Sequence, residues 1–487
     1  MRKLPAPGQS PRIHYKYVRF VGLALAVAAL MAGLRWTTHA QIAVKNQGYV
    51  PFSEPPINYR SDGLSDPVAK LQQRLDQGEA HLTYEPKNGY LRSVLKELQV
   101  PINSQMLVFS KTSFQYKKIS PEHPRALYFN DDVYIGQVHQ GKAIEVISFD
   151  PKQGAIFYLL DERKTETPKF ERAELDCTQC HIAAGTRGVP GVLLRSIYPT
   201  SIGTQATSTK SFITDQESSI ENRWGGWYVT GKLDASRVPS MANAVLQGDA
   251  SSASTTARLV PISAAYDPSE LLSGSSDVVA HLVLAHQTQA HNLITLTNYR
   301  TRIALYNQRK DGRTDTELPE DAKLQYERPA EQLVRYLVFS NEAPLDGLNI
   351  QEEADSEFAK TFASDGPRDS KGRSLRDFDL KHQTFRYPCS YLIYTESFDS
   401  IPEPAKSYLY HRLYQVLSGE DQTTDFAGIS ASSRRTALEI LLATKPGLPE
   451  EWQHYARTNH LHLATNFRPQ TNLRAQTSTL HQPLRGQ

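Results

Sequence analysis

The fold is decided by residues 125–162, which read RALYFNDDVYIGQVHQGKAIEVISFDPKQGAIFYLLDE. Apolar runs rich in aromatic and β-branched residues alternate in this stretch with the polar sequences NDD, HQGK and DPKQG. Short apolar runs between such turn sequences are typical of consecutive antiparallel strands. The stretch therefore predicts a β-meander.

The chain then reaches residues 174–185, which read ELDCTQCHIAAG and contain two of its three cysteines. Cys177 and Cys180 are separated by two residues and followed at once by His181, which is the C-x-x-C-H pattern of c-type haem attachment. A disulfide or a redox dithiol would also use two cysteines, but a disulfide across so short a loop stabilises little. We therefore predict one covalently bound haem c on a short helix capped by Asp176, with His181 as the proximal iron ligand.

The sixth iron ligand is predicted from the scarcity of methionine. Beyond the first 40 residues the chain contains only Met106 and Met241. Met241 follows His181 by 60 residues, a separation that suits the opposite wall of one haem pocket, and we predict it as the sixth ligand. The alternative is that Met241 only packs in the core. Met106 lies in SQMLVFS, which alternates like a strand, and we expect it in the core.

A long helix offers competing ligands. Residues 277–310 contain no proline or glycine, and a capping sequence begins them. The helix carries His281, His286 and His291 at a spacing of five residues, which does not form the i, i+4 pair of two ligands to one metal. Single histidines, led by His286 and His291, are therefore the alternative sixth ligands. The ordinary interpretation of all three is a hydrogen-bonded helix histidine.

Four further residues are predicted to contact the cofactor. Arg195 and Arg223 can bind the two haem propionates because a guanidinium forms a planar fork that matches a carboxylate. The alternative is that both arginines form ordinary ion pairs at the surface. Trp224 and Trp227 flank two glycines in NRWGGWYVTGK, where close backbone approach would let an indole stack on the porphyrin edge. The alternative is that both tryptophans are core residues of a strand.

The first 40 residues have the layout of an export signal. Five basic residues precede the apolar run 20–34, and the small-residue sequence TTHAQIA follows it. We predict cleavage near Ala40 and a periplasmic or otherwise exported protein, with an uncleaved N-terminal anchor in the inner membrane as the alternative. Removing residues 1–40 takes away six of the 54 basic residues and none of the 52 acids, which leaves a net charge of about −4. This balance, without a basic stripe, gives no reason to expect a nucleic-acid partner.

The rest of the chain predicts an α+β protein in which a sheet region carries the haem helix and a mainly helical half follows. The sequence QGDASSASTTAR, residues 247–258, predicts a mobile linker between these parts. The sheet distinguishes the protein from class I cytochromes c, which are almost entirely helical. The predicted segments are a linker with short helices (41–100), a haem-bearing sheet-rich domain (101–246), a mainly helical domain (259–464) and a disordered tail (465–487).

At several motifs the sequence resembles a family of large, exported bacterial proteins that contain a cytochrome c domain with a single C-x-x-C-H site. The resemblance extends from about Leu107 to Trp452 and includes LVFSKTSFQ, PRALYFNDDVYIG, CTQCH, RWGGWYVTG, HQTQAHNLIT, GPRDSKGRSLRDFDL and RYPCSYLIY. In the family pattern, WYVTG is followed by Thr-His-Gly and later by His-Met-Gly-Asn. This chain has Lys-Leu-Asp at 232–234 and Ser-Met-Ala-Asn at 240–243, so it keeps Met241 but lacks both histidines. The resemblance implies a haem, export, and Met241 rather than a nearby histidine as the sixth ligand.

Two functions follow as hypotheses. The first is an exported monohaem electron-transfer protein, acting with a redox partner protein or as a subunit of a dehydrogenase. The second is a peroxidase-like haem enzyme with an open distal site, where a helix histidine would act as acid and base. One haem cannot store the two electrons of peroxide reduction without a radical or a second centre, whereas a simple carrier does not need so long a chain. The third cysteine, Cys389, is expected to be a buried core residue.

Overall fold

The computed structural model describes residues 50–207, 209–232, 241–247, 258–262, 266–312 and 318–464. From Phe52 onward the chain forms one compact unit. The predicted signal or anchor (1–40) and the predicted disordered tail (465–487) lie outside the described residues. Within the described ranges, no helix is both long enough and apolar enough to cross a bilayer.

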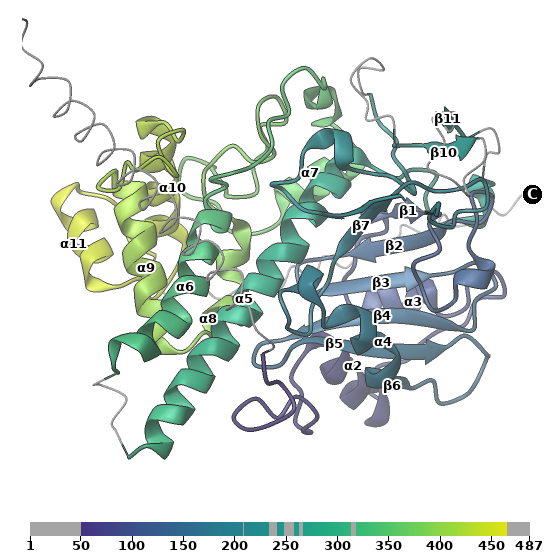
Figure 1. The fold of residues 1–487 in the computed structure, drawn as a ribbon, viewed down its shortest axis with the longest axis horizontal. Helices are drawn as coiled ribbons and strands as arrows, with labels where there is room; N and C mark the ends of the chain where they lie inside the picture. Colours follow the sequence, from purple (N-terminus) through teal and green to yellow (C-terminus); the bar gives the residue numbers. More distant parts are fainter. Residues whose placement is uncertain are drawn as a thin grey trace, which may run out of the picture. The chain divides into compact units, whose positions relative to one another are not determined.

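An antiparallel sheet of seven strands carries the first half of the chain (Figure 1). Its strand order is β6-β5-β4-β3-β2-β1-β9, so the predicted β-meander is confirmed as strands β2 to β5. Strands β1 and β9 extend the meander at one edge, and β6 extends it at the other. The strands are Met106–Val108 (β1), Arg125–Phe129 (β2), Val133–Gln137 (β3), Ala143–Asp150 (β4), Gly154–Asp161 (β5), Phe170–Arg172 (β6) and Trp227–Tyr228 (β9).

The register of the sheet fixes which residues share a face. Met106 is paired with Leu127, Leu127 with Gly136, Gly136 with Glu145, and Glu145 with Leu159. Paired residues on neighbouring strands point to the same face, so these five positions form one row across five strands. We call the face that holds this row the cavity face.

Two helices lie on the cavity face. The long helix α5 (Val278–Lys310) places the ring of His291 on Phe149, with ring centroids 3.9 Å apart. The short helix α4 (Glu174–His181) packs on β5, where the ring of His181 lies against Phe157. In Figure 1, α4 stands in front of the lower strands of the sheet.

The opposite face of the sheet is covered by α2 (Pro67–Asp76) and α3 (Leu91–Glu97). Asp66 caps α2 by accepting hydrogen bonds from two amides of its first turn. The same carboxylate accepts a hydrogen bond of 2.8 Å from the hydroxyl of Tyr158, which points to this face. These contacts fix α2 behind β4 and β5.

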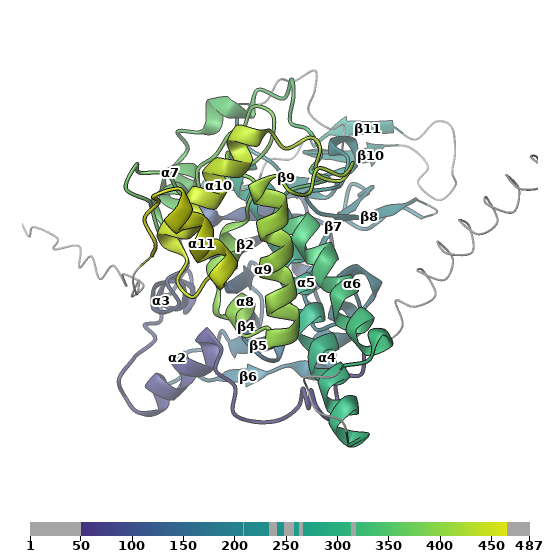
Figure 2. The same ribbon diagram turned by 90° about the vertical axis from the view of Figure 1, so that its left-hand side faces the viewer.

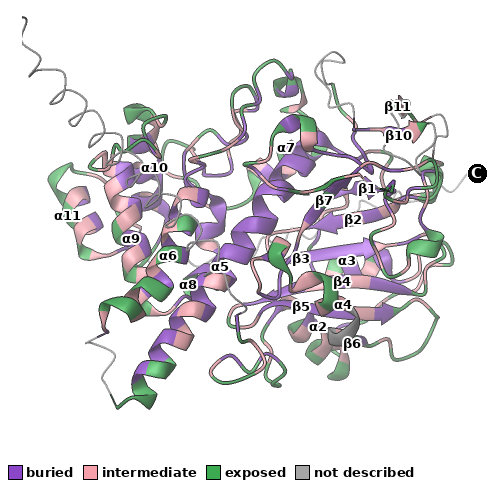
Figure 3. Ribbon diagram, viewed as in Figure 1, coloured by how far each residue is buried: buried purple, intermediate pink, exposed green. Residues whose placement is uncertain are grey.

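The second half of the chain is mainly helical, as predicted. Asp277 caps α5, which runs to Lys310 as expected and is buried over most of its length (Figure 3). Helix α6 packs on α5, and α9, α10 and α11 follow in series (Figure 2). Sheet and helices share one hydrophobic core. The other α-helices of the described residues are Glu320–Leu337 (α6), Glu357–Ser364 (α7), Glu396–Asp399 (α8), Glu403–Ser418 (α9), Ala431–Thr444 (α10) and Glu450–Thr458 (α11).

The sequence predicted as a linker has strands at both ends. Gln247 at the end of β10 (Ala244–Gln247) pairs with Arg258 at the start of β11 (Arg258–Pro261), so the two ends lie side by side. The residues between them lie outside the described ranges. A second two-stranded sheet, β7 (Leu194–Ile197) with β8 (Ser211–Thr214), follows α4. Strands of four residues are too short to give a clear alternation in the sequence.

Candidate functional site

The C-x-x-C-H motif lies on α4, directly after the last strand of the meander region. The predicted helix is confirmed, but it begins at Glu174, two residues before the predicted Asp176 cap. The predicted start was wrong because β6 ends at Arg172 and leaves a single residue for the turn. The side chains of residues 174–176 lie outside the described part. Cys177 is half-buried and Cys180 is exposed.

A cavity of about 490 Å³ adjoins the motif. Cys177, Cys180 and His181 line one side of it, and the cavity face of the sheet lines another. A space of this size with mostly apolar walls and a few polar groups is typical of a small-molecule or cofactor site. The apolar lining includes Met106, Leu127, Ile147, Phe157, Leu159 and Leu284.

His181 is held so that one ring nitrogen stays open. Its Nδ1 lies 2.9 Å from the carbonyl oxygen of Gly191, which can only accept a hydrogen bond, so Nδ1 carries the proton. Nε2 of the neutral ring then keeps a lone pair that can bind a metal. Burial lowers the pKa of His181, which favours this neutral form.

Helix α5 fixes the loop that orients His181. Asn292 accepts a hydrogen bond of 3.0 Å from the amide of Val192 and donates one of 2.7 Å to its carbonyl oxygen. Gly191 permits this close approach, because a Cβ there would lie 2.0 Å from Oδ1 of Asn292. Sequence analysis missed Gly191 and Asn292, because the contact joins segments 100 residues apart. A polar residue in the middle of a buried helix was the signal that could have found Asn292.

One ion pair lies within the largely apolar lining. Arg125 pairs through its terminal nitrogen with Oε2 of Glu145. The guanidinium crosses Gly136, where a Cβ would lie 2.4 Å from it, so a larger residue there would force the Arg125 side chain to move. Oε1 of Glu145 accepts hydrogen bonds from the hydroxyl of Ser113 at 2.6 Å and from Nε2 of Gln115 at 2.9 Å. Nε of Arg125 is buried and has no hydrogen-bond partner.

Two of the four predicted cofactor contacts reach the cavity. Arg195 and Trp227 both line it. The indole Nε1 of Trp227 donates a hydrogen bond of 2.9 Å to the carbonyl oxygen of Arg195, which fixes the ring in the wall. The side chain of Arg195 is exposed at the rim.

The other two predicted contacts, Arg223 and Trp224, do not line the cavity. Arg223 is buried and donates hydrogen bonds to the carbonyl oxygens of Ser218 at 3.0 Å and Gln216 at 2.9 Å. It therefore holds the turn before the short 3-10 helix Ile220–Asn222 instead of facing a propionate. Trp224 is a core residue whose ring meets His281 edge to face, with centroids 6.2 Å apart. Trp224 therefore packs in the core, as the alternative to a haem contact had it.

The structure does not bring Met241, the predicted sixth ligand, to the cavity. Met241 is buried, and its methyl group lies so close to Gly225 that a Cβ there would be 2.6 Å from it. Met241 therefore packs in the core, which was the alternative to its predicted role as the sixth ligand. Met106 is buried on β1, as expected, but its position also lines the cavity. Distance along the sequence could not separate the two methionines, because strand pairing decides which one faces the motif.

The three histidines of α5 are buried and none lines the cavity. The two ring nitrogens of His286 lie 2.5 Å from Oε1 of Gln216 and 2.7 Å from the hydroxyl of Ser390. Nε2 of His281 and of His291 each meets a backbone carbonyl, at 3.0 and 2.7 Å. Burial lowers the pKa of His286 to about 3 and those of His281 and His291 to about 4. The ordinary interpretation as structural histidines fits these contacts.

Cys389 is a fully buried core residue, as expected. Burial raises the pKa of its thiol to about 12, so the thiolate form is scarce at neutral pH. A thiol in this state is a poor nucleophile.

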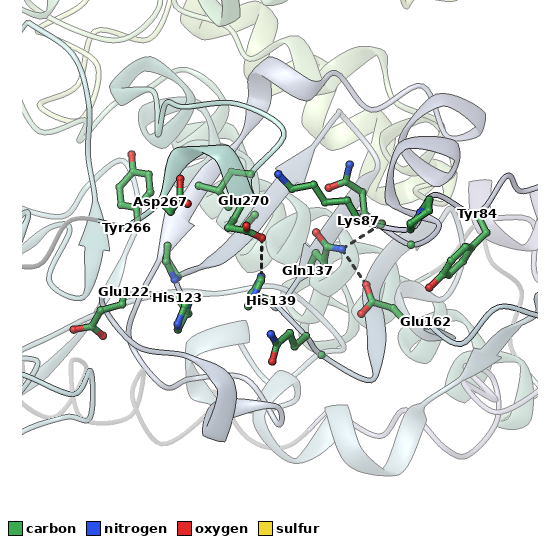
Figure 4. A pocket seen from close by; sticks show the side chains of 18 residues that line it. Tyr84, Lys87, Glu122, His123, Gln137, His139, Glu162, Tyr266, Asp267 and Glu270 are labelled. Atoms are coloured by element: carbon green, nitrogen blue, oxygen red, sulfur yellow. Dashed lines mark hydrogen bonds and ion pairs between the residues drawn. The ribbon is translucent and has the colours of Figure 1, made fainter.

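A second pocket, of about 270 Å³, lies over the opposite face of the sheet (Figure 4). The rings of His123 and His139 stack there at 5.1 Å and 11°, and Nδ1 of His139 lies 3.6 Å from a carboxylate oxygen of Glu270. Gln137 donates a hydrogen bond of 3.0 Å to Glu162. Most of the side chains that line this pocket are polar, and none is a cysteine. We call it the polar pocket.

Comparison with models of protein families, with curated proteins and with solved structures finds no match to this chain. Within the described residues, no group of three or more His, Cys, Asp or Glu side chains is arranged to hold a metal ion. Function is therefore inferred from the site, where a single imidazole and two thiols border one apolar cavity.

Proposed function

We propose that this chain is an exported monohaem c-type cytochrome that transfers electrons. The observation that carries this proposal is that the C-x-x-C-H motif borders an apolar cavity of about 490 Å³. Both thiols that would attach a haem and the imidazole that would bind its iron face the same space. A haem is a broad and mostly apolar group, so this space suits it.

The chemistry of the donor set fits a haem. Each thiol of Cys177 and Cys180 can add across one vinyl group, with its sulfur bonding to one carbon and its hydrogen moving to the other, so no oxidant is needed. The open Nε2 of His181 would bind the iron of that haem. Its Nδ1 bond to Gly191 is the kind of second contact that orients a metal-bound imidazole.

The charges of the lining fit a haem as well. Lys111, Arg125 and Arg195 bring three positive charges to the cavity, and Glu145 brings one negative charge. This excess of two positive charges matches the two propionates of one haem. The buried Nε of Arg125 is a donor that a carboxylate could use. Arg195 is therefore still proposed to bind a haem propionate. Arg223 is not, because its guanidinium is already held by hydrogen bonds to backbone carbonyl oxygens.

Two features of the chain would serve electron transfer by a bound haem. When bound, a c-type haem exchanges one electron between its ferric and ferrous states. Cys177 and Cys180 would hold it at the edge of α4, with Cys180 at the exposed end of the motif. Apolar sheet residues line the other side of the cavity and would keep a bound haem away from water there. The redox partner would approach from the exposed side.

Electron transfer is favoured over the peroxidase-like alternative by the composition of the lining. Among the described residues that border the cavity, His181 is the one histidine, so no second imidazole stands ready as a distal acid and base. Both nitrogens of His286 are engaged elsewhere. Met106 offers a thioether to the same cavity, and a methionine ligand closes the iron to substrates.

The proposal is tested on protein recovered from the periplasm of a host that makes c-type cytochromes. A redox titration followed by visible absorption should show one reversible one-electron couple, and the ferrous form should bind carbon monoxide slowly. Fast carbon monoxide binding together with peroxide turnover would replace electron transfer by the enzyme hypothesis. Protein that is exported but shows no haem absorption would refute both. Fusion of residues 1–45 to a reporter active only outside the cytoplasm tests export separately.

A further inference from the structure

The ion pair of Arg125 and Glu145 lies in a cavity whose walls are mostly apolar. The side chains of Arg125 and Glu145 are only 18% and 13% exposed, and they lie among apolar residues of the cavity face. Burying two charges costs free energy that their mutual attraction often does not recover. Apolar residues would therefore serve stability at least as well at these two positions. The pair suggests a role beyond stability.

The pair is built into the fold with little freedom. Gly136 leaves the space through which the guanidinium passes, and the register sets Glu145 beside Gly136 on the next strand. Ser113 and Gln115 hold the second oxygen of Glu145 from the loop above. Both charges are thus fixed at the floor of the cavity, and Nε of Arg125 remains buried and unpartnered.

Arg125, Glu145 and His181 line the same cavity. Glu145 lies on β4, and His181 packs against Phe157 on the neighbouring strand β5, so the ion pair and the imidazole border one space. Charges that are largely shielded from solvent interact more strongly than charges in water.

We propose that Arg125 and Glu145 set the reduction potential of a haem attached at Cys177 and Cys180. This inference rests on the proposed function. Reduction adds one negative charge at the metal, so a nearby guanidinium favours the reduced form and a nearby carboxylate favours the oxidised form. The two side chains are only 18% and 13% exposed, so solvent screens their charges less than it screens charges at the surface. Neither residue is a ligand, and each acts on the iron through its charge.

The test is a set of charge variants whose midpoint potentials are measured on protein with covalently attached haem. Glu145→Gln leaves Arg125 unopposed and should raise the potential. Arg125→Gln leaves Glu145 unopposed and should lower it. The double variant removes both charges and should return close to the wild type, and Arg125→Lys should lie closer to the wild type than Arg125→Gln. Loss of packing alone would not give shifts of opposite sign that cancel.

The matched control is the ion pair of Arg412 and Glu331 between α9 and α6, whose side chains are each 19% exposed. Arg412→Gln and Glu331→Gln should alter stability but leave the potential unchanged, because this pair does not line the cavity. If the variants of Arg125 and Glu145 keep the haem but shift the potential in the same direction, or do not shift it, the inference is wrong. The proposed function would still stand. Wild-type protein without covalent haem overturns the proposed function, and the inference with it.

Discussion

The two faces of one sheet carry spaces of different character. β3 contributes Gly136 to the apolar cavity and the next residue, Gln137, to the polar pocket. Successive residues of a strand point to opposite faces, so a single step along the chain separates the two. The polar pocket has two histidines and no cysteine, whereas the cavity has one histidine and two cysteines. The number of histidines alone would favour the polar pocket, whereas the thiols and the apolar walls are the features that favour the cavity as the proposed haem site.

The largest expected effect is a loss of covalent haem that follows changes in the cavity but not changes in the polar pocket. Cys177→Ala with Cys180→Ala should abolish covalent haem, because no thiol remains beside the cavity to form the thioether bonds. The matched change in the polar pocket, His123→Gln with His139→Gln, should leave haem content unchanged. Haem staining after denaturing electrophoresis measures both. The contrast breaks if the cysteine variant keeps its stain or if the polar-pocket variant loses it.

The buried histidines of α5 should make the protein sensitive to acid. Folding holds the pKa of His286 at about 3 and those of His281 and His291 at about 4, whereas histidines of the unfolded chain bind protons below about 6.5. Below pH 6.5 the unfolded state therefore binds more protons, and the free energy of unfolding falls as the pH drops toward about 4. Each ring contributes up to about 3 kcal/mol to this loss.

Urea unfolding between pH 7 and pH 4 measures this effect. His286→Gln removes one titrating ring but keeps groups that can bond to Gln216 and Ser390, so the decline in stability with falling pH should be shallower. A variant with the wild-type pH dependence would show that His286 does not titrate as proposed.

The two methionines give a smaller effect that sharpens the same comparison. Met106 lines the cavity and Met241 does not, so Met106→Ala should speed carbon monoxide binding to the ferrous protein and lower the reduction potential. Met241→Ala should change neither property, although both variants lose buried packing. Stopped-flow absorption measures the binding rate. The reverse pattern would restore Met241 as the sixth ligand that the sequence predicted.

The smallest expected effect belongs to the polar pocket. His139→Gln removes a contact of 3.6 Å to Glu270 between partly exposed side chains. Pairs of this kind contribute about 0–1 kcal/mol, so the midpoint of urea unfolding should barely move. The reduction potential should not change either. A loss of several kcal/mol or a shifted potential would mean that the two faces of the sheet are coupled.

Local patterns predicted much of this fold. The turns of residues 125–162 predicted four strands in the right order, and the uninterrupted run from Asp277 to Lys310 predicted α5. The C-x-x-C-H spacing located the motif because three neighbouring residues carry its chemistry. Such features depend on residues that are close together in the sequence.

The walls of the cavity could not be predicted in the same way. Arg125, Gly136 and Glu145 come together through the register of three strands, and Asn292 reaches Val192 across 100 residues. Met241 and Arg223 were chosen by residue type and distance along the chain, which do not say to which side of a strand or turn a side chain points. Sequence analysis therefore located the C-x-x-C-H motif better than the cavity around it.

The central claim is that Cys177 and Cys180 carry a haem. Trypsin cleaves after Arg172 and Arg187 and releases residues 173–187, which contain the whole motif and no other cysteine. Mass spectrometry of the exported wild-type protein should find this peptide with the mass of one haem added and with haem absorption. The bare peptide with two thiols open to alkylation would contradict the account.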